Sequence, residues 1–413
     1  MIRASTGAAS ATHLLCIAFS LVASSAPLAA GDPIRIEGPE QSRLDVTKIN
    51  GGLEPLPGVT SHEVFRAPAD GYTYNHHVDL ACWKGRLYLG WNSCQKDEDA
   101  WPSREVYSTS ADGRTWDAPK ELFPQGLSTP IRMFFFHAPN GRMLAIAGLR
   151  MSHERLVERN KGPVVVREIA ADHTLGDVFL LVKPTEGTKI TTGVPTPPLY
   201  RSATDTGFVE ACNQLLANRP FLEQQDYGTA LGDRRMKWHD VTNWAAVDEY
   251  TRGRADFFGK GFSFFHRKDG ALVGISKLGF VVVSTDEGET WGTPVRPRTL
   301  VTGGAKVWGQ RTSDGRYALA YNPHLTERFP LVLVHGDDGV TFRDMRVVFG
   351  NKPPLRHPGE HKGPGPQYVR GISQWSSDGS WNDDAMWVCY SVNKEDIWIS
   401  RIPVPIGGGS QAR

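Results

Sequence analysis

Short apolar runs alternate with turn residues along most of the chain. The runs are rich in Val, Ile, Leu and aromatic residues, and Gly, Asp or Asn separates one from the next. Clear examples are GRLYLGWN (85–92), GRMLAIAGL (141–149), GFVVVST (279–285), GRYALAYN (315–322) and PLVLVHG (330–336). This spacing is typical of hairpins in series and predicts an all-β fold.

A second repeat adds detail to this fold. The sequences SADGRTW (110–116), STDEGETW (284–291) and HGDDGVTF (335–342) share an aspartate, a glycine and a final aromatic residue. An aspartate in such a turn accepts hydrogen bonds from backbone N–H groups, and glycine takes the left-handed conformation. We therefore interpret Asp112, Asp286 and Asp337 as structural. The three copies resemble the Asp box of sialidase-like β-propellers.

The spacing of these copies predicts the number of blades. Trp291 and Phe342 are 51 residues apart, about the length of one four-stranded blade. Residues 1–30 contain one basic residue and an apolar run that ends in small residues, the layout of a signal peptide. The other residues would hold roughly seven blades, with six as the alternative. We expect a single propeller domain over 31–405.

Two further segments depart from the β pattern. Residues from about 208 to 254 are dense in helix formers and charge, so a helical or irregular insertion is predicted there. Residues 406–413 include GGGSQAR and are expected to be disordered. The signal peptide predicts a secreted or periplasmic protein.

Composition excludes several classes of function. The chain has 46 Lys and Arg against 45 Asp and Glu, so attraction to nucleic acid is not expected. Beyond the signal peptide, the sequence has no apolar segment of membrane-spanning length. Four mature cysteines allow three disulfide pairings, which stay open. We expect a monomer with no metal or cofactor, and leave a structural Ca²⁺ ion open.

The sequence YNHH at the start of a strand carries the candidate chemistry. His76 and His77 are adjacent, and neighbouring side chains in a strand point to opposite faces, so one of them is expected to face the centre. The region 74–116 resembles the first blade of ulvan-lyase and α-L-rhamnosidase propellers. That resemblance implies that a histidine near the start of this blade acts on an acidic glycan. The choice between the two stays open, with a preference for His76.

A uronate substrate would also need cations and a proton-transferring group. Arginine binds carboxylates through two parallel hydrogen bonds, and the candidates at the expected starts of first strands are Arg132, Arg311 and Arg370. Tyr368 is two residues from Arg370, which predicts a shared strand face, and arginine would lower its pKa. Other candidates for substrate binding are Tyr321, His324 and Trp308.

These residues predict an enzyme that cleaves a glycosidic bond in an acidic polysaccharide or oligosaccharide. Our preferred mechanism is β-elimination at a uronate, and a closely related rhamnosidase-type hydrolysis is the neighbouring possibility. An exo-sialidase is the first alternative, although YNHH stands where sialidases place an arginine motif. A pair of catalytic carboxylates is not singled out among Asp79, Glu98, Asp99, Glu360 and Asp396. A non-catalytic propeller that binds a glycan or a protein is the other alternative.

Overall fold

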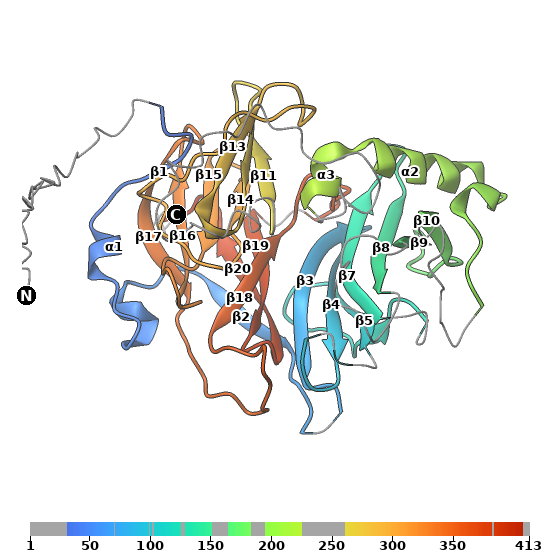
Figure 1. Cartoon of the computed structure of the whole chain (residues 1–413), viewed down its shortest axis with the longest axis horizontal. Helices are drawn as coiled ribbons and strands as arrows, with labels where there is room; N and C mark the ends of the chain where they lie inside the picture. Colours follow the sequence, from blue (N-terminus) through green and yellow to red (C-terminus); the bar gives the residue numbers. More distant parts are fainter. Residues whose placement is uncertain are drawn as a thin grey trace, which may run out of the picture. The chain divides into compact units, whose positions relative to one another are not determined.

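The computed structural model describes residues 31–407 apart from 70, 99, 101–102, 125–128, 151–163, 183–194, 225–260 and 382–383. The described residues from Pro33 onward form one compact unit. This unit is a β-propeller (Figure 1). The predicted signal peptide and residues 408–413 lie outside the described residues, whereas Ile406 is buried in the core.

The described strands form five sheets, which we number as blades in chain order. Blade 1 contains β3 (Tyr74–Trp83), β4 (Arg86–Cys94), β5 (Ser103–Ser110) and β6 (Lys120–Glu121). Blade 2 contains β7 (Thr129–His137), β8 (Met143–Arg150), β9 (Val164–Ile169) and β10 (Phe179–Val182). Blade 3 contains β11 (Ser263–His266), β12 (Leu272–Ile275) and β13 (Val281–Ser284).

Blades 4 and 5 each add a strand from the N-terminal part of the chain. Blade 4 contains β14 (Trp308–Arg311), β15 (Tyr317–Tyr321), β16 (Leu331–Gly336), β17 (Thr341–Phe349) and, parallel to β17, β1 (Arg35–Ile36). Blade 5 contains β18 (Pro366–Gly371), β19 (Ala385–Val392), β20 (Asp396–Pro403) and β2 (Thr60–Phe65). Because β2 pairs antiparallel with β20, hydrogen bonds join the two ends of the blade series.

The first strand of each blade lies toward the centre of the propeller. Strand β3 contacts both β7 and β18, and β14 contacts both β11 and β18. Figure 1 shows blade 5 beside blade 1, although they come from opposite ends of the sequence. Apolar side chains of neighbouring sheets pack together, as in the cluster that Trp91, Leu89 and Val106 of blade 1 form with Trp387 and Ile399 of blade 5. This packing fixes the first strands side by side.

The predicted seven-bladed fold, and its six-bladed alternative, are wrong: the described strands form five blades. The prediction divided the mature length by the length of one blade, which assumes that nearly every residue belongs to a blade. However, β10 ends at Val182 and β11 begins at Ser263, and no strand is described between them. The segments before β2 and before β18 also consist largely of connections.

Helices are few. The longest are α2 (Thr206–Ala217) and α3 (Arg219–Gln224), and they fall in the predicted insertion, whose residues from 225 to 254 lie outside the described part. The Asp205 carboxylate caps α2 by accepting from the N–H groups of Gly207 and Phe208. The apolar faces of α2 and α3 pack on blade 2. The short helices are α1 (Glu40–Arg43), η1 (Ile49–Gly52), η3 (Tyr200–Ser202) and η7 (Lys277–Gly279).

The Asp-box sequences form tight turns. The Asp112 carboxylate accepts from the backbone N–H groups of Arg114 and Thr115 at 2.8 and 2.7 Å, and these bonds lower its pKa to about 2. Asp286 accepts from the hydroxyl and N–H of Thr290 at 2.6 and 2.8 Å.

The third copy differs from the prediction. Asp338, rather than Asp337, accepts from the N–H groups of Val340 and Thr341, while Asp337 forms an exposed ion pair with Arg316. In this copy the turn residue immediately precedes glycine, as Asp112 precedes Gly113 in the first copy.

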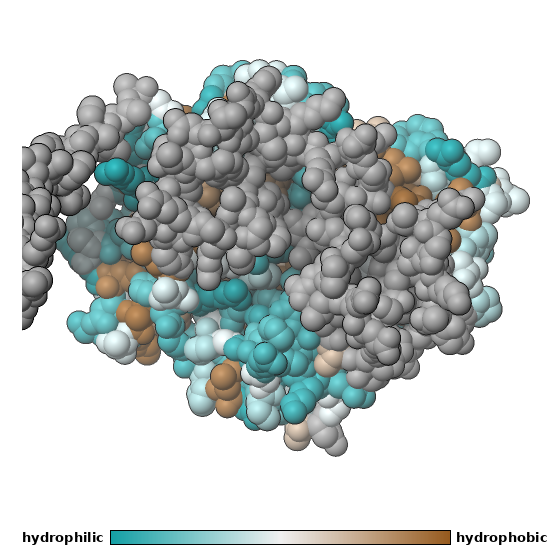
Figure 2. Space-filling model, in the orientation of Figure 1, coloured by the Kyte–Doolittle hydropathy of each residue, from teal (hydrophilic) through white to brown (hydrophobic). Residues whose placement is uncertain are grey.

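The surface of the described residues is mostly polar on the face shown in Figure 2. The large apolar side chains that are exposed among the described residues are scattered: Ile49, Val295, Leu325 and Leu355. In the described part, no helix has the length and apolar character that a membrane crossing requires. Cys82, Cys94, Cys212 and Cys389 are buried.

Candidate functional site

The candidate site lies where blade 1 meets blade 5, at two bulged first strands. In β3, His76 pairs with Asn92 and Asp79 pairs with Gly90, so β3 carries one extra residue. In β18, Gln367 pairs with Ser391 and Arg370 with Cys389, which gives the same bulge. Non-glycine residues with positive φ sit in both bulges: His77 (φ 55°) and Tyr368 (φ 57°).

The bulges bring three rings together. The ring centroid of His76 lies 4.3 Å from that of Tyr368 and 4.7 Å from that of His77. The rings of His77 and Tyr368 are 5.4 Å apart in a T-shaped arrangement. The expectation that only one histidine faces the site is therefore wrong, because the positive φ at His77 breaks the alternation of the strand.

Cations surround the phenol of Tyr368. Lys277 donates a hydrogen bond to the Tyr368 hydroxyl, and its Nζ lies 4.4 Å from the ring centroid. The Arg328 guanidinium and the Lys306 ammonium lie 5.0 and 5.1 Å from the same centroid. Burial alone raises the pKa of this phenol, but Lys277 and Arg328 outweigh that effect and lower the pKa to about 8. A phenol with this pKa can exchange a proton near neutral pH.

His76 is buried and electrically neutral. Burial holds its pKa well below the usual range, and the nearby His77 and Lys394 lower it further. Its Nδ1 is 2.6 Å from the Ser391 hydroxyl, whereas its Nε2 has no hydrogen-bond partner among the described residues. A neutral imidazole against the ring of Tyr368 positions the phenol without adding charge.

His77 belongs to a different network. Its Nε2 is 3.5 Å from Oε1 of Glu98, and Lys394 Nζ is 3.4 Å from Oε2 of the same carboxylate. Burial raises the pKa of Glu98, but His77 and Lys394 together lower it far below its ordinary value. Glu98 is therefore an anion that lies within reach of both His77 and Lys394.

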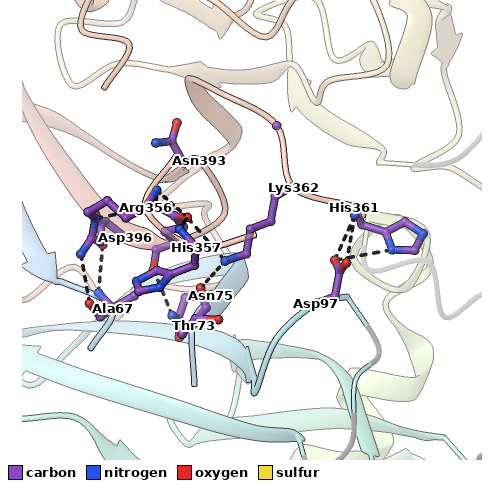
Figure 3. Close-up of polar contacts among 12 residues, drawn as sticks. Ala67, Thr73, Asn75, Asp97, Arg356, His357, His361, Lys362, Asn393 and Asp396 are labelled. Carbon is purple, nitrogen blue, oxygen red and sulfur yellow. Dashed lines mark hydrogen bonds and ion pairs between the residues drawn. The ribbon is translucent and has the colours of Figure 1, made fainter. Parts of the chain in front are cut away.

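The segment 356–362 supports this network from outside (Figure 3). The Asp97 carboxylate accepts from the N–H of His361 at 3.0 Å and also from the N–H of Glu98. Lys362 is fully buried, donates to the Thr73 carbonyl at 2.9 Å and pairs with Glu395 at 3.5 Å. These contacts tie the loop that carries Glu98 to the start of blade 5.

Two of the predicted arginines do not contact Tyr368 in any described interaction. Arg370 is buried, its Nη2 donates to the Gln224 carbonyl at 3.0 Å, and its guanidinium lies over the rings of Phe134 and Trp308. The bulge separates it from Tyr368, so the predicted shared face is wrong. Arg132 lies in β7, where the backbone register also shifts between Pro130 and Arg132, and its side chain is outside the described atoms.

No described interaction joins the remaining predicted residues to Tyr368. Tyr321 is fully buried in the core of blade 4, and burial raises its pKa. His324 accepts from the N–H of Glu327 at 2.9 Å within its own loop. Trp308 is buried and donates to Gln310, and Arg311 is exposed at the end of β14. Sequence reasoning thus brought together His76, His77 and Tyr368 but not these four residues.

Sequence reasoning missed the site's cations Lys277, Lys306, Arg328 and Lys394. They come from loops at one end of the blades and not from first strands. Lys277 lies two residues after β12 ends, and Lys394 lies in the β19–β20 hairpin, so both sit at the hairpin ends that adjoin the starts of β11 and β18. That position, a lysine just after a second strand, is the signal that could have found them.

The arrangement can bind an anion and move a proton. Four cations and one carboxylate surround the three rings, which gives a positive site that suits a carboxylate-bearing ligand. The described residues contain no group of three or more His, Cys, Asp or Glu side chains placed to hold a metal ion.

Comparisons with known proteins agree with the fold. A family model described as "BT_1020-like, N-terminal beta propeller" matches residues 32–131 and 128–233. A solved sialidase structure is 30% identical with a TM-score of 0.75, and the match covers 91% of this chain but 35% of the sialidase chain. The chain thus spans about a third of the length of that protein. No curated protein matches the chain.

More distant structures were also found. A protein of unknown function from Dyadobacter fermentans is 14% identical with a TM-score of 0.49, covering 84% of this chain and 99% of that chain. Trypanosoma rangeli sialidase in complex with sialic acid is 12% identical with a TM-score of 0.48, covering 84% of this chain and 59% of that chain.

Together, the family model and the 30% identical sialidase support a sialidase-like propeller.

Proposed function

We propose that the protein cleaves a glycosidic bond beside a uronate in an acidic glycan, by β-elimination. The observation that carries this proposal is the phenol of Tyr368, which accepts a hydrogen bond from Lys277 and has a pKa of about 8. A tyrosine of this kind is a suitable base at mildly alkaline pH. The similarity to a sialidase supports a glycan as the ligand.

The substrate carboxylate would bind among Lys306, Arg328 and Lys277. All three lie within about 5 Å of the Tyr368 ring. The C–H bond next to a carboxylate becomes acidic only when the negative charge that develops there is stabilised. These cations would supply that stabilisation beside the base.

The cations around Tyr368 and the contact between His77 and Glu98 suggest which groups transfer protons. The Tyr368 phenolate takes the proton from the carbon next to the carboxylate, the C–H electrons form the new C=C bond, and the bond to the glycosidic oxygen breaks. His77, held by Glu98, gives a proton to the departing oxygen. His76 keeps the Tyr368 ring in place.

A substrate panel tests this proposal. The protein is incubated with uronate polysaccharides and with sialosides, and the ultraviolet absorbance of unsaturated uronate products is followed. We expect this absorbance with at least one uronate glycan. Reducing sugar without the absorbance would contradict elimination and favour rhamnosidase-type hydrolysis, and no cleavage of any glycan would favour a binding protein.

A pair of tyrosine variants tests the role of Tyr368. Tyr368→Phe removes the proposed base, so we expect a loss of about 10²–10⁴-fold in rate. Tyr317→Phe is the matched control, because the Tyr317 hydroxyl is fully buried in the core of blade 4 and has no partner among the described residues. Equal activity of the two variants would exclude Tyr368 as the base.

A sialidase-type hydrolase is the second candidate. The 30% identical sialidase favours it, and a tyrosine among cations would also suit attack at the anomeric carbon of a carboxylated sugar. A tyrosine nucleophile is activated by a neighbouring base. Against this candidate, the described side-chain contacts of Glu98 are with His77 and Lys394 and not with the Tyr368 hydroxyl. Release of sialic acid from the sialosides of the panel would select this candidate.

We further propose that the protein is exported, because residues 1–30 have the layout of a signal peptide. N-terminal sequencing of the mature protein from the exported fraction tests this, with a start near residue 31 expected. A mature protein that keeps Met1 would contradict it.

A further inference from the structure

A pocket lies between blades 3, 4 and 5. Its volume is about 360 Å³, within the usual range for small-molecule sites. The ends of β11 and β14 and the segment after β18 line it. The lining residues that the argument uses are Phe264, Phe265, Trp308, Gln310, Arg311 and Ser377.

This pocket is at the opposite end of the first strands from Tyr368. Ser377, which lines the pocket, forms a bridge with Cys82 of β3. Cys82 lies six residues beyond His76 in the same strand, roughly 20 Å at about 3.3 Å per residue. In β14, Arg311 is the last residue of the strand. The pocket is therefore separate from the Tyr368 site.

The pocket combines apolar rings with one available cation. Phe264, Phe265 and Trp308 line the pocket, although most of each side chain is buried in the core. Among the described residues, no hydrogen bond or ion pair engages the Arg311 guanidinium, whereas Arg267, the other arginine of the lining, pairs with Asp269. Gln310 uses its carbonyl oxygen to accept from Trp308 at 2.7 Å, and its amide N–H groups have no described partner.

Close packing gives this pocket a defined wall. A Cβ atom at Gly371 would lie 2.3 Å from Nε1 of Trp308 and 2.7 Å from Oε1 of Gln310. Only glycine lets the backbone pass so close to this pair. Trp308 and Gln310 are therefore held in one arrangement, which reduces the entropy lost when a ligand orders them.

We propose that this pocket is a second, non-catalytic site that binds one carboxylated sugar unit. The carboxylate would accept two hydrogen bonds from Arg311, and the Gln310 amide would donate to a sugar hydroxyl. The choice of an acidic sugar rests on the proposed function. A site at this end would hold one part of a long acidic chain while another part of the same chain occupies the Tyr368 site. This raises the effective concentration of substrate at the Tyr368 site.

Ligand-observed NMR with glucuronate as the probe tests the site, and glucose is the neutral reference. The full chain carries Tyr368→Phe and Arg328→Ala, which weaken the other site. In this background we expect Arg311→Ala to reduce glucuronate binding by about tenfold or more, because a bidentate charged contact is lost. Arg114→Ala is the matched control, since Arg114 is also exposed and its side chain has no described partner.

Equal binding by the Arg311→Ala and Arg114→Ala proteins would overturn the proposal, as would equal binding of glucose and glucuronate. The result is independent of catalysis. Loss of binding with Arg311→Ala, together with no cleavage of any glycan by the wild type, would retain this site and reject the proposed function. Cleavage of a glycan by the wild type without Arg311-dependent binding would retain the proposed function and reject this second site.

Discussion

The Asp-box turns and the bulges of β3 and β18 both place residues at positive φ, but they fill these positions differently. In the turns the residues are mostly glycines: Gly113 (φ 70°), Gly288 (φ 80°) and Gly339 (φ 72°), with Glu287 (φ 56°) beside Gly288 as the exception. In the bulges they are His77 and Tyr368, with large rings. Glycine adopts this conformation without a steric cost, whereas other residues pay roughly 1–2 kcal/mol. Non-glycine residues at positive φ also occur in turns elsewhere in the described chain, but the two in the first-strand bulges carry the candidate chemistry.

Among variants that test the bulges, Lys277→Met should show the largest effect, a shift in the pH dependence of the rate. If the phenolate of Tyr368 is the base, as proposed, the rate of the wild type should rise as pH increases through about 8. Removing the Lys277 ammonium raises the pKa of the phenol, so the midpoint should move up by about one unit or more and the rate at neutral pH should fall about tenfold. The measurement is a pH–rate profile of the purified variant.

Lys268→Met is the control for this profile, because Lys268 is exposed and lies in a turn. It should keep the wild-type midpoint. An unchanged midpoint in Lys277→Met would show that another group controls the rate.

The Gly113→Ala variant addresses the turn side. A Cβ atom at this position would lie 2.1 Å from the Trp387 ring and would also have to adopt φ 70°. We expect a loss of about 2–4 kcal/mol in the free energy of unfolding. Urea unfolding measures it, and Gly141→Ala is the matched control with similar φ and no atom within 4 Å. Equal losses in the two variants would show that the conformation, and not the contact with Trp387, sets the cost.

The third Asp box gives a smaller effect. Asp338→Ala removes the acceptor of two backbone N–H groups, so a loss of about 1–2 kcal/mol in unfolding free energy is expected. Asp337→Ala removes only an exposed ion pair and should change stability by about 0.5 kcal/mol or less. The reverse order in thermal or urea unfolding would restore Asp337 as the turn residue.

Two variants of His77 should show the smallest effect, a difference in stability that separates the strain of the backbone from the loss of the imidazole. Both His77→Gly and His77→Ala remove the imidazole, so both should lose activity. Only glycine relieves the positive φ, and we expect the Gly variant to be more stable than the Ala variant by about 1 kcal/mol. Equal stability in urea unfolding would mean that the bulge relaxes when the ring is removed.

Local patterns predicted much of this fold. Alternating apolar runs and turn glycines were sufficient to predict hairpins, and the Asp-box sequences predicted turns in a propeller. The number of blades could not be obtained in the same way. Length gives the blade count only if connections are short, and the connection from β10 to β11 is long.

The candidate site was predicted in part. His76, His77 and Tyr368 were selected for their chemistry, and the bulges place their rings together. The cations were missed because regular alternation cannot reveal an inserted residue. One extra residue in β18 places Tyr368 among loop lysines and directs Arg370 to Gln224 instead. Arg311 and Trp308 have the expected residue types, but they line the pocket at the other end.

The pairing of β2 with β20 has a consequence for biosynthesis. His76 is in the first blade and Tyr368 in the last, so their rings can meet only after nearly the whole chain has been made. Strand β2 must also stay available until β20 emerges. A nascent or truncated chain that lacks blade 5 would therefore carry both histidines but lack Tyr368, so the candidate site would form only once the ring of blades is complete.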